Sequence, residues 1–188
     1  TSGILWHPET HYDMVRAGIG MYGLSPDPSV KSARQLGIEA AMTLSAPLTS
    51  VKVIEEGTPA SYGGTWQAPT RRWIGLVPLG YGDGILRASS NGAPVVVETE
   101  RGLFPTQIVG RVCMDQFMID LGPAEGEEGT PTSASGRPPA HVGDRAFLFG
   151  DPEKGCPSAD KWALHAGTIN YEIVTRLGER IPRNYQYE

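Results

Sequence analysis

The stretch Val77-Pro78-Leu79-Gly80-Tyr81-Gly82-Asp83-Gly84-Ile85-Leu86-Arg87 decides how the rest of the sequence is interpreted. Residues 73–79 form an apolar run that predicts a buried strand, and three glycines follow within five residues. Because glycine accepts backbone angles that other residues resist, this spacing predicts a tight turn or bulge that presents Tyr81 away from the strand. Asp83 can accept hydrogen bonds from the amides of such a turn. Taken alone, the stretch favours a plain hairpin turn with a surface tyrosine, because Gly-Asp-Gly turns are common.

The composition of the chain is that of a globular protein rich in turns. Its 188 residues suffice for one substantial domain, or for a domain plus a piece of another. Hydrophobic residues make up 39% and charged residues 20%, which argues against a disordered chain. The 24 glycines and 16 prolines favour many short strands over long helices. Since the sequence starts at Thr1 and not at methionine, we expect a fragment or a processed product.

Charge and cysteine content narrow the possible partners. The net charge is -5, from 16 basic and 21 acidic side chains, which disfavours a surface for nucleic acid or anionic membrane. The sequence has no apolar run long enough to span a membrane and no visible signal peptide. Cys113 and Cys156 form neither a metal-ligand pair nor a disulfide framework. We therefore expect no metal, no nucleic acid and no membrane, and a cytoplasmic protein.

Residues 14–24 differ in composition from the later part of the chain. They are apolar and rich in glycine, with Arg16 as their single charge, and predict a strand buried on both faces, as in a parallel sheet. A buried guanidinium needs an acceptor, so Arg16 either forms a salt bridge or faces a ligand. The backbone amides of Gly18, Ile19 and Gly20 are suited to cradle an anion such as phosphate.

Short strands dominate from about residue 39 onward. Residues 26–34 contain two prolines and read as a linker. The later strands are separated by turn residues and predict an antiparallel β domain, either a barrel or a sandwich. We expect them over residues 41–53 (one strand or two), 72–79, 94–98, 106–121 (two strands broken at 113–116) and 146–149.

The second half of the chain also contains a predicted insertion and a helix. Residues 122–141 are rich in Gly, Pro, Ser and acidic side chains, and we interpret them as a mobile surface insertion without chemistry. Residues 158–171 predict a helix with Ser158 as its N-cap and an apolar face. Residues 172–177 and 181–183 have a β-like composition, and the proline in the second segment suggests an edge.

Four strings of the sequence together resemble motifs of alanine racemase, in the order that the family has them. The first resembles the last strand of its barrel and the second its catalytic-tyrosine loop. The resemblance covers nearly the whole chain except residues 123–139, and it is to the C-terminal part of the family only. The strings are Met14-Val15-Arg16-Ala17-Gly18-Ile19-Gly20-Met21-Tyr22-Gly23, Leu79-Gly80-Tyr81-Gly82-Asp83-Gly84, Gly110-Arg111-Val112-Cys113-Met114-Asp115-Gln116 and Thr168-Ile169-Asn170-Tyr171-Glu172.

The resemblance implies a fold-type-III pyridoxal-phosphate enzyme, in which a (β/α)8 barrel precedes a β domain. Residues 1–35 would be the last strand of that barrel and a linker, and residues 36–188 the antiparallel, barrel-like C-terminal domain with one short helix. The rest of the barrel is absent from this sequence. With it are missing the lysine that forms the Schiff base with pyridoxal 5'-phosphate and the arginine that helps to hold the substrate carboxylate. We therefore expect the fragment alone to be inactive.

The resemblance implies that Tyr81 is the acid/base that removes the α-proton of L-alanine, opposite the absent lysine. Two bases on either side of a planar carbanion suffice for racemisation, which in this family supplies D-alanine for peptidoglycan. A free phenol has a pKa of about 10, so cationic neighbours are expected. Arg16 would face the pyridine nitrogen of the cofactor, and because arginine keeps its proton, that nitrogen would stay unprotonated.

Further roles follow from the same resemblance. Tyr81, Met114 and Asp115 would serve the active site of the partner subunit, which implies a head-to-tail homodimer with shared sites. The implied contacts are Thr1, Gly18, Ile19 and Tyr171 to the cofactor phosphate, the Met114 backbone amide to the alanine substrate, Asp115 as a residue that orients the site, and Arg111 and Ile169 near the entry channel.

Two alternatives remain beside the alanine racemase interpretation. The first is a racemase of another small amino acid such as serine, since a pocket discriminates one methyl or hydroxyl group by only about 1–3 kcal/mol. The second is a non-catalytic β-barrel module for binding or dimerisation, in which Tyr81 is a structural aromatic residue. A small nucleic-acid-binding barrel is disfavoured by the charge and by the lack of a basic aromatic stripe.

Overall fold

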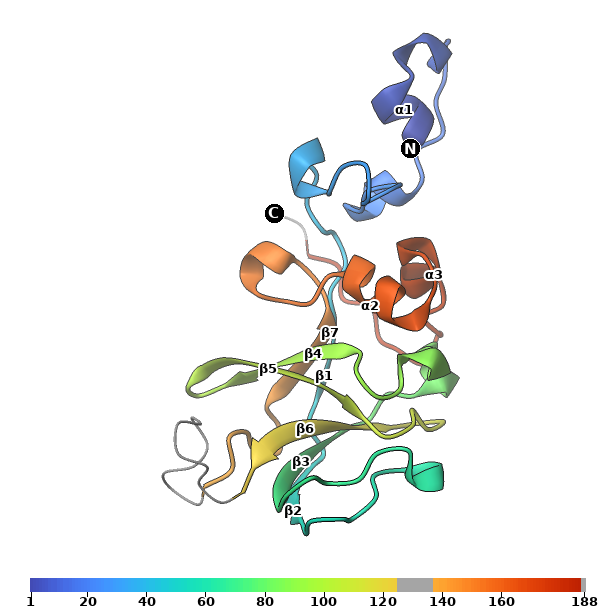
Figure 1. Cartoon of the computed structure of the whole chain (residues 1–188). Coiled ribbons are helices and arrows are strands. Elements are labelled where there is room, and N and C mark those ends of the chain that lie inside the picture. Colours follow the sequence, from blue (N-terminus) through green and yellow to red (C-terminus); the bar gives the residue numbers. More distant parts are fainter. Residues whose placement is uncertain (125–136, 187–188) are drawn as a thin grey trace.

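A computed structural model describes residues 1–124 and 137–186 of the chain. The described residues form a seven-stranded sheet in the order β1-β7-β4-β5-β6-β3-β2, and every neighbouring pair is antiparallel (Figure 1). This architecture confirms the predicted antiparallel β domain. The strands are β1 (Leu44–Pro47), β2 (Ser50–Ile54), β3 (Arg72–Val77), β4 (Pro94–Thr99), β5 (Gly102–Val109), β6 (Phe117–Pro123) and β7 (Arg145–Phe149).

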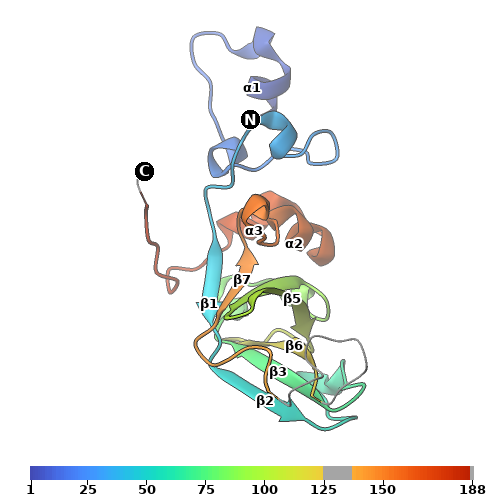
Figure 2. The same ribbon diagram turned by 90° about the vertical axis from the view of Figure 1, so that its left-hand side faces the viewer.

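The sheet curls because its two edge strands, β1 and β2, are consecutive in the sequence. Only Leu48 and Thr49 join them, and the three Cα steps from Pro47 to Ser50 span at most about 11 Å. A flat seven-stranded sheet would hold its edges roughly 29 Å apart at about 4.8 Å per strand. The sheet therefore bends into a half-open barrel, as Figure 2 shows. Two hydrogen bonds hold this connection between β1 and β2, from Leu48 N to Asp144 O at 2.8 Å and from Thr49 N to Leu76 O at 2.9 Å.

The core lies inside this barrel and under two helices. Every second residue of β6 from Phe117 is buried, as expected for a strand with one face inward. The inward residues share one cluster with Trp162 of helix α2 (Ala159–Ala166). The indole Nε1 of Trp162 donates to Pro94 O at 2.9 Å, which satisfies its only polar atom. Helices α2 and α3 (Asn170–Thr175) lie over one end of the barrel (Figure 1).

The C-terminal helix prediction was partly wrong. Ser158 does cap α2, accepting from Lys161 N at 3.1 Å, but the helix ends at Ala166 because Gly167 adopts the left-handed conformation at φ +67°. Residues 172–177 are not β-like: most of them belong to α3, where the helical turn buries Ile173 and Val174 against the core. Packing thus overrides their strand propensity. Residues 181–183 form no regular element.

The N-terminal prediction of a buried strand was also wrong. Residues 1–43, all of which the structure describes, contain helix α1 (Ser2–Trp6) and short 3-10 helices, but no strand. A strand needs a hydrogen-bonding neighbour, and the described sheet begins only at Leu44. Residues 14–18 are instead exposed. The 3-10 helices within the described residues are Pro8–Thr10, Ile19–Tyr22, Arg34–Leu36, Tyr62–Gly64, Tyr81–Asp83, Arg87–Ser89 and Pro152–Lys154.

Most strand boundaries agree with the sequence. Residues 41–53 contain two strands, and the predicted break at 113–116 lies between β5 and β6. Strand β6 continues to Pro123, at the approximate start of the predicted insertion (about 122–141). Residues 125–136 of that insertion lie outside the described residues. Among the helices of the described ranges, none combines the length and the apolar character that crossing a bilayer requires.

Candidate functional site

The tyrosine turn follows β3 and is built by its own side chains and amides. Residues Tyr81–Asp83 form one 3-10 turn, in which Asp83 N donates to Gly80 O at 3.0 Å. The Asp83 carboxylate, nearly buried, accepts from Gly80 N at 2.9 Å through Oδ2. Gly84 ends the turn at φ +101°, a conformation that favours glycine. The turn leaves Tyr81 43% exposed, so this residue is open to contact from outside the chain.

This turn is bonded directly to the 113–116 turn between β5 and β6. Tyr81 N donates to Cys113 O at 2.9 Å, and Gly82 N donates to Met114 O at 2.8 Å. A Cβ atom on Gly80 would lie 2.3 Å from both of those acceptor carbonyl oxygens. Glycine is therefore required at residue 80 by this close approach, since its own φ of -149° is open to any residue. Two motifs that are distant in sequence thus meet in one place.

Arg180 joins the same two turns through its guanidinium. Its Nη2 lies 3.0 Å from Asp83 Oδ1 and 3.0 Å from Asp115 Oδ1. The hydrogen bond to Asp115, together with the charge of Asp83, raises the pKa of Arg180 above its ordinary value. Tyr81, Met114 and Asp115, which the sequence predicted as one group, are therefore brought together, and Arg180 is added to them.

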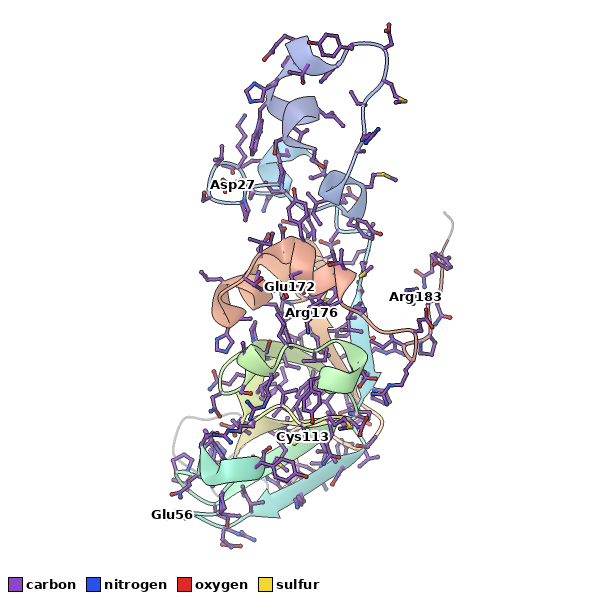
Figure 3. The ribbon with its side chains drawn as sticks, turned by 90° about the vertical axis from the view of Figure 1, so that its right-hand side faces the viewer. Asp27, Glu56, Cys113, Glu172, Arg176 and Arg183 are labelled. Atoms are coloured by element: carbon purple, nitrogen blue, oxygen red, sulfur yellow. The ribbon has the colours of Figure 1, made fainter. Side chains whose placement is uncertain are left out.

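Arg111 lies beside this group, just after β5, and it contacts the loop Ser61-Tyr62-Gly63-Gly64-Thr65. The hydroxyl of Ser61 donates to Arg111 O at 2.6 Å. The Arg111 guanidinium packs over Gly63, where a Cβ atom would lie 2.8 Å from Nη1. Cys113 follows on the same turn, and Figure 3 shows it on the barrel, away from the helix that carries Glu172 and Arg176. Ile169, the other predicted entry residue, is exposed immediately before α3.

A second group forms around Thr1. Its Oγ1 accepts from Gly18 N at 3.2 Å and from Gly20 N at 3.1 Å, at the start of the 3-10 helix Ile19–Tyr22. The Ile19 side chain is buried in the core. The expectation that Arg16 is buried was wrong: it is exposed, and it forms no ion pair with any residue that the structure describes. Its segment is irregular and does not lie in a sheet.

Tyr171 lies on α3. Hydrogen bonds connect this helix to Ser25, which follows the second group in the sequence. The buried Asn170 side chain donates to Ser25 O at 2.8 Å and to Asp160 Oδ1 at 2.7 Å. Tyr171 itself is half-buried against the core. Within the described ranges, no hydrogen bond or ion pair joins Thr1, Gly18, Ile19 or Tyr171 to the Tyr81 group. The predicted site residues therefore form two groups.

Comparison with known proteins assigns a family to this arrangement. The sequence profile of the family described as "Alanine racemase, C-terminal domain" matches residues 41–185, which is most of the chain. The chain belongs to the alanine racemase C-terminal domain family. This confirms the resemblance that the four ordered motifs predicted.

Relatives of the alanine racemase family match over nearly the whole chain. The alanine racemase of Streptomyces coelicolor is 44% identical over 181 residues, which are 96% of this chain and 42% of that protein. That of Thermobifida fusca is 43% identical over 185 residues, or 98% of this chain and 44% of that protein. A solved structure, alanine racemase from Streptomyces coelicolor A3(2), matches with a TM-score of 0.85 at 42% identity, covering 99% of this chain and 44% of its own.

The chain thus spans less than half the length of the alanine racemases that it matches. Both of these relatives and the solved structure are named alanine racemases. They therefore favour neither a serine racemase nor a free-standing binding module.

Two residues of this alanine racemase domain were missed by sequence reasoning. Asn170 was quoted in a motif but given no role, and Arg180 was not singled out. The contact between Arg180 and Asp115 joins residues 65 positions apart, so no local pattern indicates it. The available signal was chemical: two carboxylates, Asp83 and Asp115, on turns expected near one site need a cation between them.

Proposed function

We propose that this chain provides the C-terminal part of a pyridoxal-phosphate-dependent alanine racemase that interconverts L-alanine and D-alanine. One observation carries the proposal: in a member of this family, the turn that holds Tyr81 (the Tyr81 turn) is hydrogen-bonded to the 113–116 turn, called the Met114 turn below, and Tyr81 is exposed. We further propose that residues 1–35 belong to the barrel and linker and residues 36–188 to the β domain. The absence of strands before Leu44, within a segment that the structure describes throughout, supports this division.

Tyr81 is the base for one face of the substrate. It removes the α-proton of L-alanine, and a lysine outside this chain serves the other face. The turn supports this role because it fixes the backbone on both sides of the Tyr81 side chain, through Tyr81 N to Cys113 O and through Gly82 N to Met114 O. A phenol held at a set position avoids the entropic cost of orienting a free base. The Met114 backbone, bonded to Gly82, is fixed beside it as the proposed substrate contact.

The residues around Thr1 fit a phosphate group. Phosphate is bound in proteins by hydroxyl groups and by converging backbone amides, and here the amides of Gly18 and Gly20 converge on one oxygen acceptor, Thr1 Oγ1. A Cβ atom on Gly20 would lie 2.9 Å from Thr1 Cγ2, so glycine keeps the amides close to this hydroxyl. The cofactor, when bound, withdraws electrons from the α-carbon and makes its proton more acidic.

Four residues would hold the cofactor phosphate in this chain: Thr1, Gly18, Ile19 and Tyr171. Arg16 would face its ring nitrogen. The exposure of Arg16 and its lack of an ion pair among the described residues leave the guanidinium available for such a contact. Because arginine keeps its proton, it would donate to that nitrogen without protonating it.

A head-to-tail homodimer would bring the two groups into one site. The Tyr81 group of one subunit, with Asp115 orienting it, then acts beside the cofactor held by the partner subunit. The lack of any bond between the two groups within the described chain supports such sharing. Arg111 and Ile169 would line the entry. D-alanine for peptidoglycan is the proposed product, and the free thiols of both cysteines suit a reducing cytoplasm.

The test joins this chain to the preceding part of the Streptomyces coelicolor relative, a protein we call the reconstituted enzyme. We expect it to interconvert L- and D-alanine with pyridoxal phosphate and to lose that activity when the cofactor is removed. A folded reconstituted enzyme that binds the cofactor without racemising alanine would refute the proposal. Parallel assays with serine measure its specificity.

A further inference from the structure

We propose that Arg180 is a positioning residue of this racemase, which holds the Tyr81 turn against the Met114 turn through Asp83 and Asp115. The inference rests on the function proposed above, because it assigns to Arg180 the relative placement of the proposed base and the proposed substrate contact. Arg180 does not itself touch the reacting atoms in this account.

The geometry places one guanidinium nitrogen between the two turns. Arg180 Nη2 lies 3.0 Å from Asp83 Oδ1 and 3.0 Å from Asp115 Oδ1. A Cβ atom on Gly82 would lie 2.5 Å from the same nitrogen. The guanidinium therefore lies directly over the tyrosine turn, in a space that a side chain at residue 82 would fill.

The two carboxylates differ in their need for this partner. The Asp83 side chain is only 9% exposed, and its Oδ2 is already engaged by Gly80 N, so Oδ1 depends on Arg180. A buried carboxylate without a partner is costly, and the turn would have to open to solvate it. The Asp115 side chain is 62% exposed and could be solvated by water without Arg180. Loss of Arg180 therefore acts first on the turn that carries Tyr81.

Arg180 also supplies a point of attachment that the backbone bonds do not. The two backbone bonds between the turns, at Tyr81 N and Gly82 N, both run to carbonyl oxygens of the 113–116 turn. Arg180 reaches the turn from the C-terminal segment, which is itself anchored by Gly178 N donating to Asp83 O at 2.8 Å. The Tyr81 turn is thus held by its Asp83 cap, by two backbone bonds to the 113–116 turn and by the C-terminal segment that carries Arg180. Together these contacts keep the phenol in one orientation.

The first test compares Arg180→Met with Arg183→Met in the reconstituted enzyme. Arg183, labelled in Figure 3, is a matched control because it lies three residues further along the exposed C-terminal segment, and its Nη2 donates to Leu177 O at 3.2 Å and, among the described residues, to no carboxylate. For Arg180→Met we expect kcat with L-alanine to fall about 10- to 100-fold, with KM changed by less than about threefold and cofactor absorbance unchanged. Arg180→Lys should recover part of kcat, since it keeps the charge but not the planar donor fork.

Three results would overturn the positioning role. They are an unchanged kcat in Arg180→Met, an equal fall in Arg183→Met, and a fall that comes with lost cofactor binding. The last would mean that Arg180 merely supports the fold.

A second test does not depend on activity. Hydrogen exchange at the Tyr81 and Gly82 amides should accelerate about tenfold or more in Arg180→Met, while the amides of β3 stay protected as in the unsubstituted chain. Unchanged exchange at these two amides would refute the positioning role of Arg180 even if the enzyme is active. An unsubstituted reconstituted enzyme that does not racemise alanine would instead refute the proposed function, so the two failures are distinct.

Discussion

Replacement of Gly80 by alanine tests the close approach of the two turns. The added Cβ would lie 2.3 Å from Cys113 O and from Met114 O, against about 3.4 Å for an ordinary contact. The turns would have to separate by roughly 1.1 Å, which strains the bonds at Tyr81 N and Gly82 N. Overpacking of this kind typically costs about 1–3 kcal/mol in the free energy of unfolding.

The effect on catalysis should exceed the effect on stability. A displacement of about 1 Å at a reacting group can reduce the rate about 100-fold. We therefore expect Gly80→Ala to lower the free energy of unfolding by about 1–3 kcal/mol in urea titrations of this chain. In the reconstituted enzyme, we expect kcat to fall about 100-fold.

Gly178→Ala is the matched control. Gly178 lies in the same region, but a Cβ atom there would meet Asp83 O at 3.5 Å, which is an ordinary van der Waals contact. We expect this variant to keep the stability and kcat of the unsubstituted protein. If Gly80→Ala were as stable and as active as Gly178→Ala, the argument that glycine is required by the close approach would be refuted.

Two further predictions concern helix α3. Asn170→Ala leaves the buried Ser25 O and the part-buried Asp160 Oδ1 without this donor, and should lower the free energy of unfolding by about 1–3 kcal/mol in urea titrations; a loss below about 0.5 kcal/mol would contradict this. The hydroxyl of Thr168, which donates to Glu172, lowers the pKa of that carboxyl below its ordinary value of 4.5. The stability that the charged carboxylate contributes is therefore present above about pH 4.5 and lost as the pH falls through the lower folded pKa. Glu172→Gln should be less stable than the unsubstituted chain at pH 7, with a difference that shrinks below pH 4.5 in thermal unfolding; a difference independent of pH would contradict this.

Much of the barrel could be predicted from the sequence because its information is local. The alternation of β6, the turn glycines and the valines of β4 mark strands and turns within short segments, although β6 pairs with the distant β3 and β4 with the distant β7. The Tyr81 turn was predicted for the same reason, since its glycines and its capping aspartate all lie within five residues. The sequence was sufficient to predict an element wherever the residues that build it lie close together in the chain.

The failures came where a segment's surroundings decide its structure. The apolar run at residues 14–24 was interpreted as a buried strand, but the described chain offers it no strand to pair with. Residues 172–177 have strand propensity, but most of them form helix α3, which buries Ile173 and Val174 in the core. Arg180 was missed because its partners lie far away in sequence, and only the folded turns bring Asp83 and Asp115 within reach of one cation.

The central claim is that Tyr81 removes the α-proton of L-alanine. Tyr81→Phe deletes the one hydroxyl that the claim needs, and it keeps the ring and the backbone bond to Cys113. The most direct measurement is the exchange of the α-proton of L-alanine into deuterated water by the reconstituted enzyme. We predict that this exchange falls at least about 100-fold in Tyr81→Phe, within the usual range for loss of a general base, while cofactor absorbance stays unchanged. Exchange at the unsubstituted rate in a Tyr81→Phe enzyme that binds the cofactor would contradict the account.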